Sequence, residues 1–263
     1  MITFSLITVC YNAADTIGRT LDSVRQQRWQ HIQHIIIDGA STDGTTALLE
    51  AYRKQAVETR SPHQINIVSE PDNGIYDAMN KGLALAEGRY VCFLNAGDAL
   101  PDTDTIYNIG TRVGTWEADE PPSVIYGDTD IINTEGQVVA HRHLNAPDIL
   151  DSRSFRKGMT VCHQAFYART DIAKDTPYDL RYRYSADVDW CIRVLKAGER
   201  CYADTLNMHA VIAHYLQEGT TTRNHRASLK ERFHIMRRHY GLATTLYRHV
   251  LFLFRAAKRK TIK

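Results

Sequence analysis

Acidic and amide side chains follow four apolar runs in this sequence, where strands would end. The clearest run is Val91 to Leu94, which gives way to Asn95, two small residues and Asp98 before Pro101. Oxygen atoms of this kind suit hard cations and polar ligands. The other three loops begin at Cys10, Asp38 and Glu70. Because the same residue types also cap helices and form turns, a purely structural explanation stays open for any single loop.

The elements that must position these loops alternate between strand and helix. The predicted strands are Thr3–Val9, His34–Asp38, Ile65–Ser69 and Tyr90–Leu94, and the helices between them are Thr16–Gln27, Thr45–Arg53 and Tyr76–Ala86. This repetition predicts an α/β fold, with a parallel sheet covered by helices on both faces. In such sheets ligands bind beyond the carboxyl ends of the strands. We therefore expect the four polar loops to meet at one edge.

Length and composition are those of a folded globular protein. The 263 residues are 43% apolar and 24% charged, which suits one large domain or a domain with an appendage. No basic leader or cleavage site marks a signal peptide, and no stretch approaches the roughly 18 apolar residues of a membrane span. The five cysteines lack metal-site spacing, so we expect reduced, packed thiols in a cytoplasmic protein.

The positive charge is concentrated at the C-terminal end. The net charge is +2, but the 32 residues after Glu231 contain nine Lys or Arg and no acid, so residues 1–231 carry a net charge of −7. Apolar and basic side chains are mixed in residues 246–263, as in a helix that lies on an anionic membrane surface. A solvated helix that closes the domain explains this composition equally well. No nucleic-acid motif accompanies the basic residues, so we expect no nucleic-acid partner.

Four segments resemble successive motifs of glycosyltransferase family 2, whose members are inverting enzymes of the GT-A fold. They are SLITVCYN, IIIDGASTDGT, SEPDNGIYDAMNKGLALAEGRYVCFLNAGD and YSADVDWCIRVLKAG. The match is closest to the bacterial branch that builds exopolysaccharide, O-antigen and colanic acid. The resemblance implies a Rossmann-like, mainly parallel sheet, with a nucleotide-sugar-binding half in residues 1–100 and an acceptor-binding half in residues 101–224. Residues 225–263 would form a basic helical tail.

Transfer from a nucleotide sugar requires a diphosphate to leave, and a divalent cation or basic groups must neutralise its growing charge. Mn²⁺ and Mg²⁺ take oxygen ligands and keep water and substrate phosphates in their shell, so one protein carboxylate is sufficient. By resemblance, Asp98 is the metal-binding residue of the family's DxD-type motif. Asn95 stands where many relatives have an acid, and we expect it to contact the ribose or diphosphate of the donor.

The resemblance places the donor nucleotide across the first two loops. Thr8 and Asn12 would line its pocket, Tyr11 would flank the base, and Asp38 would reach the base or ribose. Gly39 replaces a second acid that reads uracil in many relatives. A UDP sugar therefore remains only weakly favoured, and GDP or dTDP sugars stay open.

The third loop and the helix after it supply two more candidates for donor binding. Asp72 resembles a position near the donor, and Lys81 could reach a phosphate as a point charge. The structural alternative for Lys81 is a solvated helix face. For Asp77, at the start of the same helix, the alternative is a favourable interaction with the helix N-terminus.

Inverting transfer also needs a base that takes the proton of the acceptor hydroxyl. By resemblance this base is Asp187, at the mouth of a predicted helix Val188–Ala197, while Ala186 replaces a Glu of many relatives. Asp187 could instead cap the helix, and Asp189 could be a first-turn acid.

The acceptor half contains further candidates. His163 and Gln164 resemble an HQA segment of the branch and would contact the acceptor. The Asp128-Thr129-Asp130 sequence is rejected as the metal motif, although its acids could line the acceptor cleft. His209 or His214 could complete the metal shell, but a core or surface position is favoured for each. Residues 217–222 replace a Gly-rich loop that could fold over the donor.

We therefore expect an inverting, metal-dependent sugar transferase that extends a saccharide or lipid-linked saccharide in bacterial surface polysaccharide synthesis. A nucleotidyltransferase shares a nucleotide-binding half but normally has a Gly-rich basic loop after the first strand, which CYNAADTIGR lacks. A catalytically inactive sugar-nucleotide- or membrane-binding module needs no base. The presence of both Asp98 and Asp187 argues against such a module.

Overall fold

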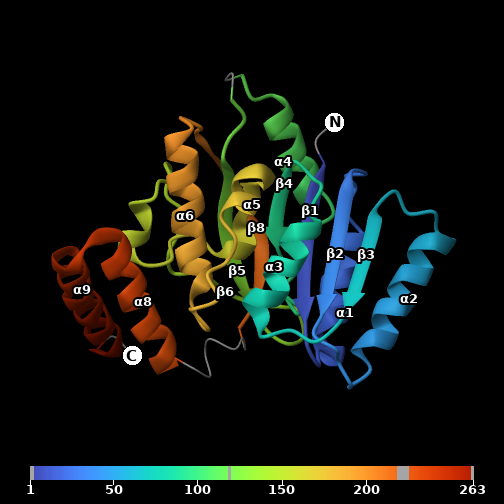
Figure 1. Cartoon of the computed structure of the whole chain (residues 1–263), viewed down its shortest axis with the longest axis horizontal. Helices are drawn as coiled ribbons and strands as arrows, with labels where there is room; N and C mark the ends of the chain where they lie inside the picture. Colours follow the sequence, from blue (N-terminus) through green and yellow to red (C-terminus); the bar gives the residue numbers. More distant parts are fainter. Residues whose placement is uncertain (1–2, 118–119, 218–224, 262–263) are drawn as a thin grey trace.

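One eight-stranded sheet runs through the protein, with helices on both faces (Figure 1). The computed structural model describes residues 3–117, 120–217 and 225–261, and the side chains of these residues except those of 225 and 253–261. The strand order is β3-β2-β1-β4-β7-β5-β6, and β8 also pairs with β5. The predicted α/β class is therefore confirmed.

The first four strands are parallel and form the half of the sheet nearest the N-terminus. They are β1 (Phe4–Cys10), β2 (Ile32–Asp38), β3 (Gln64–Ser69) and β4 (Tyr90–Phe93). Every residue of β1 and β2 is buried, as expected for parallel strands covered on both faces. The register places Cys10 beside Asp38 and Asp38 beside Ser69. The ends of β1, β2 and β3 therefore lie level at one edge.

The remaining strands extend the same sheet without a break. They are β5 (Val124–Ile132), β6 (Val138–His141), β7 (Phe166–Arg169) and β8 (Thr205–Leu216). β7 lies between β4 and β5 and is antiparallel to both, whereas β8 is parallel to β5. Since β7 is the direct neighbour of β4, the chain just before β7 reaches the end of β4.

Helices α1 (Ala14–Arg25), α2 (Thr45–Glu58) and α3 (Ile75–Leu85) follow the first three strands. Successive residues of a strand point to opposite faces. Accordingly, Ile36 packs in a cluster with residues of α1 and α2, whereas Ile35 and Ile37 pack in the main core with residues of α3. Figure 1 shows α3 in front of the sheet and α1 behind it.

The other helices belong to the second half of the chain. They are α4 (Thr105–Gly114), α5 (Thr170–Asp175), α6 (Ala186–Arg200), α8 (His225–Tyr240) and α9 (Leu242–Thr261), with short 3₁₀ helices η1 (Ser154–Lys157) and η2 (His163–Ala165). The helix α6 is longer than predicted and begins one residue before Asp187. In the part of the chain that the structure covers, none of the helices combines the length and the apolar character needed to cross a membrane.

An aromatic cluster fixes α6 against the sheet. The Trp190 ring of α6 stacks on Tyr178, with centroids 4.9 Å apart, and meets the rings of Phe93 and Phe166 at 5.3 and 5.5 Å. Aromatic side chains bury large apolar areas, so this cluster contributes strongly to the core. It places the first turn of α6 beside the end of β4.

All five cysteines have free thiols, and Cys201 is exposed while the other four are buried. The expectation of packed thiols is therefore confirmed for four of them and wrong for Cys201. Cys201 follows the last residue of α6, where the chain turns at the surface.

Candidate active site

Asp38 ties together the loops at the ends of β1, β2 and β3. Its carboxylate has no exposed surface and accepts hydrogen bonds from the Ser41 amide at 3.0 Å, the Ser69 hydroxyl at 2.6 Å and the Ser41 hydroxyl. A buried carboxylate needs such donors, because water cannot reach it. In the ligand-free protein the Asp38 side chain therefore supports the loops, and its contact with the donor stays a prediction.

Thr8 also lies in the core. Its side chain has no exposed surface, and its hydroxyl lies 3.0 Å from Nε2 of His34, whose Nδ1 lies 2.9 Å from the Tyr52 hydroxyl. Burial lowers the pKa of His34 to about 3, so the imidazole is neutral. The Thr8 side chain therefore points into the layer between the sheet and α2, and its place in the nucleotide pocket stays a prediction.

Tyr11 and Asn12 lie at the surface just beyond β1. Tyr11 is 65% exposed. Asn12 has a positive φ of 47°, its amide N–H donates to the Ser41 hydroxyl at 2.8 Å, and its Oδ1 accepts from the Thr42 amide at 2.9 Å. Asn12 therefore braces the first loop against the second, and the Tyr11 ring is free on one side.

The Asp72 carboxylate fills the space beside Gly39. A Cβ atom at position 39 would lie 2.6 Å from Asp72 Oδ2 and 3.2 Å from Cδ2 of Tyr11, so no side chain fits at this position without a shift. The other oxygen of Asp72 accepts from the Gly74 amide at 2.7 Å. An acid is thus present beside position 39, supplied by the third loop.

Lys81 holds the third loop in place. Its ammonium lies 2.8 Å from a carboxylate oxygen of Glu70 and donates to the Pro71 carbonyl at 2.8 Å. The hydrogen bond to Glu70 raises the pKa of Lys81, so the side chain is charged. A phosphate would have to compete with Glu70 for this ammonium.

Asp187 lies at the centre of a hydrogen-bonded chain that the sequence alone does not reveal. The Tyr76 hydroxyl donates to its Oδ1 at 3.1 Å, and His163 Nδ1 lies 3.5 Å from its Oδ2. On the other side of the ring, Asn95 Nδ2 lies 3.3 Å from His163 Nε2. Asn95 Nδ2 can only donate, so this arrangement fits a neutral imidazole with its proton on Nδ1. Residues of α3 and η2 therefore contact the Asp187 carboxylate of α6, and His163 connects it to the loop after β4.

The surroundings keep Asp187 ionised. Burial acts to raise its pKa, but the hydrogen bond with His163 and the positive charge of Arg232 outweigh burial and hold the pKa below its usual value. The side chain is still 14% exposed, so a substrate can reach it. An ionised, partly accessible carboxylate can accept a proton, as a general base must.

The hydrogen-bond partners and the pKa of Asp98 differ from those of Asp187. It is 3% exposed, and its two oxygens accept from the Leu216 amide and from Gln164 Nε2, both at 2.9 Å. Burial raises its pKa to about 6, because these two hydrogen bonds offset burial only in part. Gln164 is 1% exposed, and its amide orients Asp98. Its predicted contact with the acceptor stays a prediction.

The end of β4 offers a cation a small number of oxygen atoms. Besides Asp98, the buried Oδ1 of Asn95 has no hydrogen-bond partner among the described residues. In those residues no group of three or more His, Cys, Asp or Glu is arranged to hold a metal. The chemistry of this donor set fits a cation that takes most of its ligands from phosphates and water.

The other residues named from the sequence have structural partners. Asp128 accepts from the Ala146 amide at 2.7 Å, and Asp130 pairs with His141. Asp189 is fully buried and belongs to the contact between α6 and α8. His209 is exposed. Of residues 217–222, the segment from 218 onwards lies outside the described residues.

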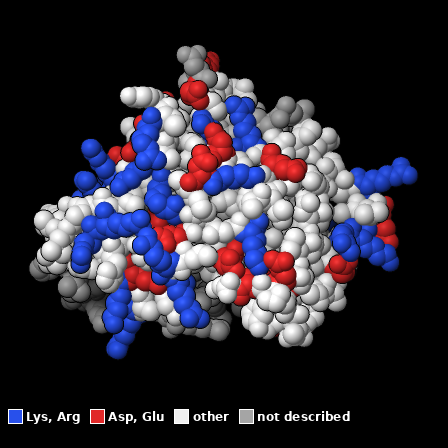
Figure 2. Space-filling view, in the orientation of Figure 1, with Lys and Arg blue, Asp and Glu red and all other residues white. Residues whose placement is uncertain are grey.

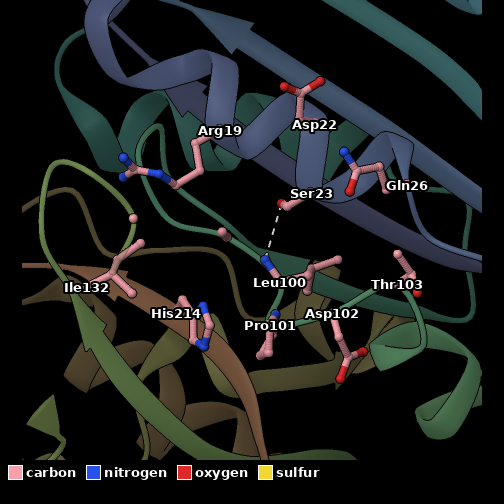
Figure 3. A pocket seen from close by; sticks show the side chains of 12 residues that line it. Arg19, Asp22, Ser23, Gln26, Leu100, Pro101, Asp102, Thr103, Ile132 and His214 are labelled. Atoms are coloured by element: carbon pink, nitrogen blue, oxygen red, sulfur yellow. Dashed lines mark hydrogen bonds between the residues drawn. The ribbon is translucent and has the colours of Figure 1, made fainter. Parts of the chain in front are cut away.

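The backbone of His214 pairs with Ala99, and its side chain lines a pocket of about 330 Å³ between α1 and residues 99–103. Figure 3 shows this pocket, where the Ser23 hydroxyl accepts from the Leu100 amide. None of the predicted donor, acceptor or catalytic residues lines it. The pocket is therefore separate from the cluster around Asp187.

Comparisons with known proteins agree with the fold described above. Residues 5–175 match the family model described as Glycosyl transferase family 2. The chain belongs to this family. This glycosyltransferase is 34% identical over 221 residues to a PGL/p-HBAD biosynthesis glycosyltransferase of Mycobacterium bovis, an alignment that covers 82% of this chain and 77% of that protein.

Two solved structures share the fold of this glycosyltransferase. S. aureus TarS in complex with UDP-GlcNAc has a TM-score of 0.68 at 16% identity, and the mannosyltransferase PcManGT of Pyrobaculum calidifontis in complex with GDP-Man and Mn²⁺ has 0.61 at 17% identity. Each match covers 90% of this chain, which spans 65% of the TarS chain and 64% of the mannosyltransferase chain. The predicted GT-A fold is confirmed.

Tyr76 is the contact of Asp187 that the sequence did not predict. It is 111 positions away in the chain, and no local pattern in the sequence connects the two residues. Burial, and then the negative charge of Asp187, raise its pKa well above the usual value, so the phenol stays protonated and donates.

The His163–Asp187 contact predicts a change in titration. Replacing His163 with Ala removes the hydrogen bond that lowers the pKa of Asp187 while burial remains, so this pKa should rise. Titration of the ¹³C-labelled Asp carboxyl groups by NMR would measure it, with Asp187→Asn used to assign the signal. His63→Ala is the matched control, since His63 is buried and hydrogen-bonded to Trp29 at a distance from the site. An unchanged Asp187 titration in His163→Ala would contradict the proposed contact.

Proposed function

We propose that this glycosyltransferase moves a sugar, with inversion, from a nucleotide-sugar donor to a saccharide or lipid-linked saccharide in bacterial surface polysaccharide synthesis. The observation that carries the proposal is the ionised Asp187 carboxylate, connected through His163 to Asn95 at the end of β4. A base is thereby held beside the loop where the donor diphosphate is expected. Family membership removes the reason to prefer a nucleotidyltransferase.

The donor lies along the edge formed by the loops after β1, β3 and β4. Tyr11 flanks the base, Asn12 and Asp72 face the nucleoside, and Asn95 contacts the ribose or diphosphate. Asp98, with the buried Oδ1 of Asn95, would hold a divalent cation, Mn²⁺ or Mg²⁺, which would neutralise the charge of the leaving diphosphate. Lys81 reaches a phosphate only by exchanging its ion pair with Glu70.

The proton of the acceptor passes to Asp187. The acceptor oxygen forms its bond to the anomeric carbon on the face opposite the diphosphate, as the bond from that carbon to the diphosphate oxygen breaks. Tyr76 and His163 each hold one oxygen of the carboxylate, which limits its rotation and points it at the acceptor. His163, which lies between Asp187 and Asn95, is our proposed contact of the acceptor.

The nucleotide is a UDP sugar in the first instance, with GDP and dTDP sugars as alternatives. The free oxygen of Asp72 beside Gly39 can accept from an N–H of the base, which uracil, thymine and guanine all carry. TarS was solved with UDP-GlcNAc and the mannosyltransferase with GDP-Man. These structures therefore support a nucleotide sugar without selecting the base.

Asp187→Asn should stop transfer and spare donor binding. Loss of a general base costs about 10²- to 10⁴-fold in rate. Transfer would be followed by release of nucleoside diphosphate, and donor affinity by calorimetry. Asp171→Asn is the control, because Asp171 forms a surface ion pair with Arg169 away from the site. If Asp187→Asn abolished donor binding, Asp187 would not act primarily as the base.

Cation binding should depend on the ionisation of Asp98. A cation needs the carboxylate charged, and the pKa is about 6, so the thermal shift caused by Mn²⁺ with a nucleotide sugar should be large at pH 7.5 and small at pH 5. A panel of UDP, GDP and dTDP sugars would also identify the base. In Asp98→Asn the Mn²⁺-dependent part should vanish at both pH values. A shift that survives this substitution would remove Asp98 from the metal site.

In the ligand-free protein, the raised pKa of Asp98 makes the folded state more stable at low pH than at high pH. The folded-state pKa of Asp98 is above its ordinary value of 3.8, so the folded protein binds this proton more tightly than the unfolded chain. This stabilisation is fully present below pH 3.8 and is lost as pH rises through about 6. The contribution of Asp98 to the melting temperature of the ligand-free protein should therefore fall as pH rises, whereas the Mn²⁺-dependent shift should grow. The ligand-free protein thus serves as a control.

We also propose that α9 contacts the inner face of an anionic membrane. Leu242, Leu246 and Val250 are spaced by four residues on this helix, and each is half exposed, as is Tyr247. Figure 2 shows Lys and Arg side chains gathered over the α6 and α8 side of the molecule. An apolar stripe with basic neighbours suits an anionic lipid surface.

A vesicle experiment tests the role of α9. Replacing Leu246 and Val250 with Glu should release the protein from phosphatidylglycerol vesicles in a flotation assay, because it removes apolar area and adds negative charge. Val57→Glu is the control, since Val57 is an exposed apolar residue on a different helix, α2. Unchanged flotation of the α9 variant would contradict a membrane contact.

A further inference from the structure

The helix α8 reaches back to the turn that precedes α6. One carboxylate oxygen of Glu231 accepts from the Arg183 amide at 2.8 Å, and the other accepts from the amides of Tyr184 and Ser185 at 2.8 and 2.9 Å. Three consecutive backbone donors therefore converge on one side chain, 46 to 48 positions further along the chain. Asp187 follows this turn after a single residue.

Glu231 binds the backbone just ahead of α6. Ser185 is the N-cap residue of α6, but its hydroxyl makes no capping hydrogen bond. It lies instead 2.9 Å from the hydroxyl of Ser228, and both serines are buried. The amides that donate to Glu231 belong to the N-cap residue and to the two residues before it, not to the first turn of the helix. The negative charge supplied by α8 also suits the positive end of α6.

A second set of contacts holds α8 on the other side of Asp187. The Asp189 carboxylate has no exposed surface, and it accepts from His239 Nε2 at 2.8 Å and Arg193 Nε at 2.6 Å. His239 Nδ1 lies 3.1 Å from the Lys196 ammonium. The helix α8 is therefore attached to α6 both before and after Asp187 in sequence.

Arg232, next to Glu231, also comes close to the base. Its positive charge contributes to the lowered pKa of Asp187, and its Nε is buried without a hydrogen-bond partner among the described residues. The side of α8 that carries Glu231 and Arg232 thus faces the start of α6. Residues 225–240 lie beyond residues 5–175, which match the family model, so this support is a feature of the C-terminal part of the chain.

We infer that Glu231 is a positioning residue for Asp187: by fixing the three amides of residues 183–185, it sets where the base stands relative to the acceptor hydroxyl. The inference rests on the proposed role of Asp187 as the base. Reacting groups must be held within a fraction of an ångström, and a displacement of about 1 Å can cost on the order of 100-fold in rate. Loss of Glu231 should therefore slow the chemical step and leave donor binding intact.

The test is Glu231→Gln, which keeps the side chain's length but replaces one accepting oxygen with an N–H₂ group. We expect kcat to fall by about tenfold or more, while the donor KM and the donor affinity change by less than about twofold. Transfer kinetics at pH 7.5 would measure both. An unchanged kcat, or a loss of donor affinity that accounts for the whole effect, would overturn the inference.

Glu199→Gln is the matched control for stability. Glu199 lies near the other end of α6, and it accepts from the amide and hydroxyl of Ser152 at 2.7 and 3.0 Å. Each variant removes a carboxylate that accepts hydrogen bonds from backbone amides, Glu231 from residues 183–185 and Glu199 from Ser152. Both variants should therefore lower the melting temperature. Only Glu231→Gln should lower kcat. Equal losses of kcat in the two variants would show a general effect of stability and would overturn the inference.

A double-substitution cycle separates this inference from the proposed function. If Glu231 acts through Asp187, adding Glu231→Gln to Asp187→Asn should leave the residual single-turnover rate unchanged within about twofold. Effects that multiply would overturn the positioning role alone. If Asp187→Asn by itself retained full activity, the base assignment would fail, and the role of Glu231 would fall with it.

Discussion

Two consecutive side chains hold the two carboxylates on which the site depends. His163 contacts Asp187, and Gln164 donates to Asp98. Both belong to η2, which leads directly into β7, and β7 pairs with β4 on one side and β5 on the other. The position of β7 in the sheet therefore helps to set the distance between Asp98 and Asp187. Together with the aromatic cluster around Trp190, this pairing places the loop after β4 next to the first turn of α6.

The same two contacts give the carboxylates different properties. Burial acts to raise both pKa values. Asp98 receives hydrogen bonds from two neutral donors, and its pKa remains raised to about 6, whereas His163 and Arg232 bring the pKa of Asp187 below its usual value. Two acids with separated pKa values can serve separate tasks in one site. In this glycosyltransferase the separation suits the proposed roles, namely a cation ligand that loses its proton near pH 6 and a base that is already ionised below that pH.

The sequence predicted the four parallel strands and the family correctly, because apolar runs and short motifs set both. It also named Asp98 and Asp187, whose proposed roles stay predictions, but it gave no sign of which other candidates are buried. Thr8, Asp38 and Gln164 were assigned to ligands, but all three are buried and hydrogen-bonded to other parts of the protein. A polar residue at the end of a strand looks the same in sequence whether it faces a ligand or supports the loop that does.

By itself, the sequence determined the elements and the family, because hydrophobic periodicity and short motifs are local properties of the chain. Only the tertiary structure decided which donors each carboxylate receives. The partners of Asp98 are 66 and 118 positions away, and Glu231 is 46 to 48 positions from the amides it accepts. The ionisation and orientation of a buried acid depend on those partners. The sequence therefore indicated a separate basic tail after residue 225, whereas in the folded protein α8 packs at the start of α6, next to Asp187.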